Sequence, residues 1–247
     1  MMTTSATLPP EAQDALDRAV AALKKALGEN LHSLVLYGSA VRGNLVPKVS
    51  DLNLLILLEE STPDAHAAIA EAIRGPVRIE PFILGRALLA RSLQAFAIKF
   101  LSIRRNYRVL HGADPFADFQ VDESLARFLC EQQARNLRLR CVRAFVVLGH
   151  DRARYSAYLA RMSSAFFTDL AEGLRRVGTE VPRSFEERIP LFGKTFGADA
   201  SILRKLLELK SSPRTLSADE VKEFHSGLFK LLDGAVRWME AQWSSLR

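Results

Sequence analysis

Cysteine and long apolar runs are scarce in this sequence, and their scarcity excludes several classes of protein. The 247 residues include only 2 cysteines, Cys130 and Cys141. They are eleven residues apart on a predicted helix, too far for a disulfide, and they have no zinc-site spacing, so we expect both to be small core residues. No stretch approaches the roughly 20 apolar residues that cross a bilayer, so we expect no membrane partner. The N-terminus has neither the basic start nor the apolar core of a signal peptide, and we expect a cytoplasmic protein.

A strong charge of one sign is also missing. Lys and Arg number 34 against 28 Asp and Glu, which gives a net charge of +6. An excess this mild suits an anionic small substrate as well as a nucleic acid. Aromatic residues do not alternate with the basic ones, as they do in proteins that stack single-stranded bases. We therefore disfavour nucleic-acid binding of that kind and expect no sequence-specific DNA binding.

What is present is an ordinary globular composition, with 48% hydrophobic and 25% charged residues. The first half of the chain alternates helical and strand patterns. An amphipathic pattern predicts a helix from about Glu11 to Leu27, and short apolar runs bounded by turn residues predict strands. The strands are expected at Leu31–Tyr37, Leu52–Leu58, Val77–Leu84 and Tyr107–Leu110, with a further one favoured at Phe96–Ile103. Pro81 cannot donate to a ladder, so its strand is expected at a sheet edge.

The second half of the chain has helical spacing throughout. Ser-x-x-Glu capping boxes open two of its helices, at Ser184 and Ser217. Helices are expected at Asp122–Leu148, Arg152–Val177, Phe185–Phe192, Ser201–Lys210 and Ala218–Trp243. The sequence therefore predicts an α+β fold, with a mixed sheet and flanking helices over residues 1–116 and a bundle of four to five helices over residues 117–247.

The stretch from Leu31 to Glu60 carries a candidate site for phosphate. Gly38 follows a buried strand, and its missing side chain lets the backbone N–H approach an anion closely. Ser39 adds a hydroxyl donor at a possible helix start, where free N–H groups favour negative charge. Arg42, one turn later, can bind phosphate oxygens with its forked guanidinium. Lys48, in the following loop, either reaches the same phosphates or is a solvated surface lysine.

Oxygen ligands follow at the next strand. Asp51 and Asn53 alternate at its start, so both side chains leave the same face. Such donors suit Mg²⁺, which usually takes one or two carboxylates and completes its shell with phosphate and water. On the strand after that, Glu80 lies beside Arg78. Arg78 is expected either to form an exposed ion pair with Glu80 or to contact a substrate.

This stretch resembles the nucleotidyltransferase superfamily that includes DNA polymerase beta, through Tyr37-Gly38-Ser39-Ala40-Val41, Pro47, Ser50-Asp51 and Leu54-Leu55. Within the superfamily it is most similar to the streptomycin/spectinomycin adenylyltransferases. The resemblance implies a nucleotidyltransferase domain over residues 1–116 that uses Mg²⁺ or Mn²⁺ and binds ATP or another NTP. It also implies that Asp51, Asn53 and Glu80 bind the metal and that Glu80 acts as general base. Asn53 stands where the family pattern has a second aspartate, which removes one negative charge.

Two functions stay open at this point. The first is an enzyme that transfers a nucleoside monophosphate from a Mg-nucleotide, with ATP expected, to a hydroxyl acceptor on a small molecule, a protein or an RNA end. In it, Gly38 and Ser39 would hold the β and γ phosphates and Arg42 would neutralise charge. The residues around Glu80 are basic, which argues against a cationic aminoglycoside as acceptor. The second function is a catalytically impaired module of the same fold that binds nucleotide or a protein partner.

Overall fold

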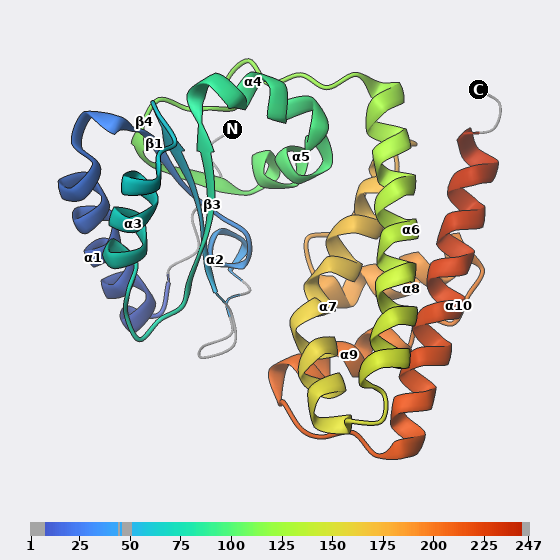
Figure 1. The fold of residues 1–247 in the computed structure, drawn as a ribbon. Coiled ribbons are helices and arrows are strands. Elements are labelled where there is room, and N and C mark those ends of the chain that lie inside the picture. The colour runs from blue at the N-terminus through green and yellow to red at the C-terminus, as the bar shows by residue number, and fades with distance from the viewer. Residues whose placement is uncertain (1–7, 44, 46–50, 244–247) are drawn as a thin grey trace. The chain divides into compact units, whose positions relative to one another are not determined.

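The computed structural model describes residues 8–43, 45 and 51–243 (Figure 1). Pro47, Lys48 and Ser50 of the predicted motif lie outside the described residues. Contacts between Cα atoms divide the chain into two compact units, Met1–Val121 and Asp122–Arg247. All the strands that the structure describes belong to the first unit. No helix of the described residues has the length and apolar character that crossing a membrane requires.

The first unit holds a four-stranded mixed sheet, which confirms the predicted fold class. Its strands are β1 (Leu31–Tyr37), β2 (Leu52–Leu58), β3 (Ile79–Gly85) and β4 (Tyr107–Gly112), in the order β3-β2-β1-β4. β1 pairs antiparallel with β2 and with β4, whereas β2 pairs parallel with β3. Parallel neighbours need a crossover connection, and α3 (Pro63–Ala72) lies in that connection.

Helices cover both faces of this sheet (Figure 1). α1 (Pro10–Leu27) and α3 pack on one face, and α5 (Ala97–Arg105) packs on the other. Because both faces are buried, β1 and β2 are almost continuously apolar. Leu34 and Leu36 enter the core beneath α1, and Val35 and Tyr37 enter the core beneath α5. The remaining elements of this unit are η1 (Gly28–Asn30), α2 (Ser39–Arg42) and α4 (Arg86–Ala95).

The strand favoured at Phe96–Ile103 is wrong, because this segment forms most of α5. The helix buries Ala97, Phe100 and Ile103, which are three residues apart. Large apolar residues at 96, 98 and 100 imitate a strand, and a segment this short can satisfy both patterns. The helical form places Phe100 in a cluster of aromatic rings under the sheet, and this packing selects it.

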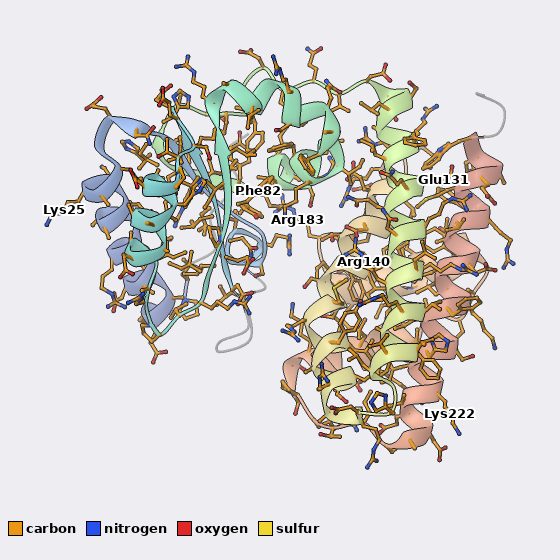
Figure 2. The ribbon with its side chains drawn as sticks, in the orientation of Figure 1. Lys25, Phe82, Glu131, Arg140, Arg183 and Lys222 are labelled. Atoms are coloured by element: carbon orange, nitrogen blue, oxygen red, sulfur yellow. The ribbon has the colours of Figure 1, made fainter. Side chains whose placement is uncertain are left out.

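β3 lies at the edge of the sheet, as its proline predicts. Pro81 is the register partner of Leu54, and an edge strand tolerates a residue without an N–H because its outer side has no partner strand. The next residue, Phe82, is labelled in Figure 2, and its ring packs on those of Phe96 and Phe100. The edge strand is therefore held to the rest of the unit by its side chains as well as by its ladder to β2.

The second unit is a helical bundle, as predicted. Its helices are α6 (Glu123–Leu148), α7 (Arg152–Arg175), α8 (Phe185–Phe196), α9 (Ile202–Ser211) and α10 (Ala218–Trp243). α6 packs on both α7 and α10, and α7 packs on α9. Cys130 and Cys141 are buried, unpaired cysteines of α6, and burial raises the pKa of both thiols. Their predicted role as small core residues is confirmed.

One of the two predicted capping boxes forms. The backbone N–H of Ser217 donates to Glu220 Oε2 at 2.8 Å, and the N–H of Glu220 donates to Ser217 Oγ at 3.2 Å. The box at Ser184 is wrong, because its side chain makes no capping hydrogen bond to α8. That helix also continues to Phe196, beyond its predicted end, and stops where Gly197 takes a left-handed φ of 62°.

Basic residues of α6 are used inside the bundle. Arg135 donates to Glu131 at 2.9 Å and also binds Glu240 of α10. Arg138 lies 4.3 Å from the ring centroid of Phe229 and 3.6 Å from Asp233, both in α10. The contacts with Glu240, Phe229 and Asp233 join α6 to α10.

Candidate functional site

The predicted site residues gather at one end of the sheet in the first unit. Tyr37, the last residue of β1, is the register partner of Asn53 in β2, and Asn53 is the register partner of Glu80 in β3. Side chains paired in this way point to the same face of a sheet, so the three form a row on the face that α5 covers. Asp51, two residues before Asn53, extends this face just outside the strand.

Gly38 follows the row directly and begins the turn into α2. Its φ of 84° and ψ of −144° lie in a region that only glycine adopts readily. The N–H groups of Val41 and Arg42 both donate to its carbonyl at 3.2 Å. The N–H groups that an anion could use are therefore those of Ser39 and Ala40. The turn has the form expected of a phosphate-binding loop, and its role stays a prediction.

Asn53 fills the space that the missing side chain of Gly38 leaves. A Cβ atom placed on Gly38 would lie 3.1 Å from Asn53 Nδ2, closer than side chains normally pack. The same Nδ2 donates to the main-chain carbonyl of Asp51 at 3.3 Å. The amide thus connects the Gly38 turn with Asp51, and its Oδ1 is the atom that could bind a cation.

Arg78 links the two carboxylates of the site. Its Nη2 donates to Glu80 Oε2 at 3.0 Å, and its Nε lies 3.7 Å from Asp51 Oδ1. The backbone holds these residues together, because the N–H of Leu52 donates to the carbonyl of Arg78 at 2.9 Å. The ion pair of Arg78 with Glu80 is one of the two predicted alternatives, whereas its approach to Asp51 was not predicted. Both pairs are open to solvent and therefore weak.

The oxygen donors of the site fit one divalent cation better than two. Asp51 and Glu80 supply carboxylates and Asn53 supplies a neutral amide oxygen, the hard ligands that Mg²⁺ prefers. With Arg78 beside both carboxylates, however, the side chains carry a net charge of only −1. Within residues 8–43, 45 and 51–243, no three His, Cys, Asp or Glu side chains are grouped to hold a metal. A single cation that brings its own phosphate ligands is the case that these residues fit.

Lys99 and Tyr37 also belong to this end of the sheet, and the sequence pattern predicted a role in the site for neither of them. Lys99 of α5 places its Nζ 5.1 Å from the ring centroid of Tyr37 and 5.7 Å from that of Phe82. Burial and, secondarily, the charge of Glu80 raise the pKa of Tyr37 to about 12, so its hydroxyl stays protonated at neutral pH. A helical interpretation of residues 96–103 is the signal that would have placed Lys99 above the sheet.

α2 carries two of the predicted phosphate ligands. Ser39 is its first residue and Arg42 its last, and both are half-buried. Gly43, with a φ of 80°, ends the helix. Lys48 lies outside the described residues, so its contact with phosphate stays a prediction.

A solved structure has the same arrangement of elements. It is spectinomycin adenyltransferase AAD(9) from Enterococcus faecialis with ATP and spectinomycin, and it superposes with a TM-score of 0.56 over 92% of this chain and 99% of that chain. The two proteins share a fold. Their sequences are 13% identical, so the likeness confirms the predicted fold and leaves the role of each site residue a prediction. No protein-family model and no curated protein matches the sequence.

Proposed function

We propose that this protein transfers a nucleoside monophosphate from a metal-bound nucleotide, with ATP the expected donor, to a hydroxyl acceptor. The observation that carries the proposal is the meeting of two carboxylates at one guanidinium: Asp51, directly before β2, and Glu80, in the neighbouring strand β3. Asn53 connects this pair to the Gly38 turn. The fold shared with an adenyltransferase solved with ATP supports the choice of nucleotide.

In the proposed reaction the acceptor oxygen forms a bond to the α-phosphorus of the nucleotide. The bond from that phosphorus to the bridging oxygen breaks, pyrophosphate leaves, and Glu80 takes the hydroxyl proton. The Gly38-Ser39 turn, through the N–H groups of Ser39 and Ala40, and the guanidinium of Arg42 hold the β and γ phosphates. Asp51 and Asn53, with Glu80, would hold Mg²⁺ or Mn²⁺, which neutralises phosphate charge.

The surroundings of Glu80 restrict the acceptor. Arg78 lies 3.0 Å from Glu80. Lys99 lies over the ring of Tyr37, which is two strands away from Glu80 in the same row of side chains. One cation at the proposed base and a second in the same row of side chains disfavour a positively charged acceptor and favour a neutral or anionic one. A hydroxyl on a small molecule, a protein or an RNA end meets this condition.

The test is transfer of label from ATP carrying a labelled α-phosphate, with Mg²⁺ or Mn²⁺ and a panel of hydroxyl acceptors, with labelling of the protein itself read in the same assay. Glu80→Gln removes the proposed base and should lower the rate by about a hundredfold or more, and Asp51→Asn should lower it through lost metal affinity. Glu71→Gln is the matched control, because Glu71 is an exposed glutamate of α3 paired with Arg74. Full transfer by the Asp51 variant would refute the proposal.

A binding module without catalysis is the second candidate. It is favoured by the neutral amide at Asn53 and by the positive charge of Arg78 between the two carboxylates, since both weaken a two-metal site. This candidate predicts ATP binding with no transfer to any acceptor. It also predicts that Asn53→Asp strengthens binding of the metal-nucleotide without producing turnover.

A further inference from the structure

We propose that Arg78 is a resident cation of this site, which competes with free divalent metal for Asp51 and Glu80 and makes metal binding depend on the accompanying nucleotide. The inference rests on the proposed function, because it concerns the same two carboxylates. It adds a selective step: metal alone is held weakly, whereas metal that arrives with a polyphosphate is accepted.

The position of the guanidinium carries the first part of this inference. Its Nη2 is 3.0 Å from Glu80 and its Nε is 3.7 Å from Asp51, so a single side chain contacts both proposed metal ligands. Backbone contacts fix the approach, because Leu52 donates to the Arg78 carbonyl and Asn53 is in register with Glu80. A cation bound between the two carboxylates would therefore lie close to the guanidinium and be repelled by it.

The charge of the site leads to the same conclusion. Asn53 contributes no charge, so Asp51 and Glu80 supply two negative charges and Arg78 cancels one of them. A free divalent ion then meets a net charge of −1. A metal bound to a triphosphate does not depend on the charge of the protein in this way, because the phosphates bring several negative charges of their own.

The guanidinium is also free to leave the carboxylates. The side chain of Arg78 is 64% exposed, and exposed ion pairs contribute little to stability. Phosphate oxygens accept the two parallel N–H groups of arginine at least as well as a carboxylate does. A nucleotide can thus draw Arg78 away from Asp51 and Glu80 while its metal takes their place.

Binding of Mn²⁺ to the protein alone, measured by titration calorimetry, tests the inference without any need for activity. Arg78→Gln should bind Mn²⁺ about tenfold more tightly than the natural protein, the ratio that 1.4 kcal/mol produces. Arg78→Lys, which keeps the charge, should stay close to the natural affinity. Arg74→Gln removes the same charge from an exposed ion pair with Glu71 at the end of α3 and should leave Mn²⁺ affinity unchanged.

A second titration separates free metal from metal-nucleotide. With ATP present, the advantage of Arg78→Gln should disappear, because Arg78 then binds phosphate instead of opposing the metal. The inference is overturned if Arg78→Gln gains no Mn²⁺ affinity, if it binds no Mn²⁺ at all, or if Arg74→Gln gains as much. If Arg78→Gln gains affinity while the natural protein transfers nothing from ATP, the inference stands and the proposed function falls.

Discussion

Replacing Gly38 by alanine should damage the turn in two separable ways. The first is backbone strain, because φ is 84° and ψ is −144°, and a residue with a side chain pays about 1–3 kcal/mol there. The second is the collision with Asn53, whose Nδ2 would lie 3.1 Å from the new Cβ. Moving that amide breaks its hydrogen bond to Asp51, which contributes about 1 kcal/mol. The expected loss of stability is therefore about 2–4 kcal/mol.

Gly28→Ala is the matched control for this substitution. Gly28 has a φ of 51° and a ψ of −128°, also a glycine conformation, but nothing lies within 4 Å of its Cβ position. Gly28→Ala should therefore lose only the stability that backbone strain removes, and the loss for Gly38→Ala should be larger by about 1 kcal/mol. In an Asn53→Ala background this excess should vanish, because the remaining neighbour, the Cβ of residue 53, lies at an ordinary 3.8 Å.

Amide hydrogen exchange of the β1 and β2 peptides measures the loss of stability in the first unit, which contains Gly38. A loss of 2 kcal/mol raises the exchange rate of amides that open globally by about 30-fold. Both tryptophans lie in α10, so their fluorescence follows the second unit and serves as an internal reference. Equal losses for Gly38→Ala and Gly28→Ala, or no rescue by Asn53→Ala, would refute the account of how Asn53 packs against the turn.

Three further outcomes follow from the structure. Asn53→Asp replaces a hydrogen-bond donor by a carboxylate that faces the carbonyl of Asp51 at 3.3 Å. Its melting temperature should therefore fall without metal and recover with Mn²⁺. The melting temperature of Asn53→Ala should also fall, but Mn²⁺ should not restore it. The raised pKa of Tyr37, about 12, means that the folded protein keeps a proton that the unfolded chain loses above pH 10. Its stability should fall as pH rises from about 10 to about 12, more gently in Tyr37→Phe, as urea titrations would show. Ser217→Ala should cost about 1 kcal/mol in urea denaturation followed by tryptophan fluorescence and Ser184→Ala much less, because only Ser217 caps its helix; equal losses would contradict this.

The part of the site that could be predicted from sequence is the part encoded locally. The run from β1 through Gly38 to Asn53 combines a buried strand, a turn that requires glycine and a second buried strand, and each of these has its own residue pattern. That Glu80, on the strand after Asn53, belongs to the same site was also anticipated, through the resemblance to known adenylyltransferases. These residues lie together as expected.

The parts that were missed depend on packing between distant segments. Lys99 comes over Tyr37 only because its segment is helical, and the spacing of the large apolar residues there fits a strand equally well. The approach of Arg78 to Asp51 depends on how a parallel edge strand is aligned with its neighbour. Ser184 has the sequence of a capping box and does not act as one. In each case tertiary contacts, not local preference, decided the outcome.

The position of β3 at the margin of the sheet has a consequence for how the site can come apart. Among the described strands it is bonded to β2 alone, yet it carries Glu80, and Arg78 directly precedes its first residue. Peeling of this one strand would remove Glu80, the proposed proton acceptor, together with Arg78, while Asp51 and the Gly38 turn stay with the β1–β2 pair. Under the proposed function, this one reversible step would abolish transfer and leave the proposed phosphate-binding turn intact.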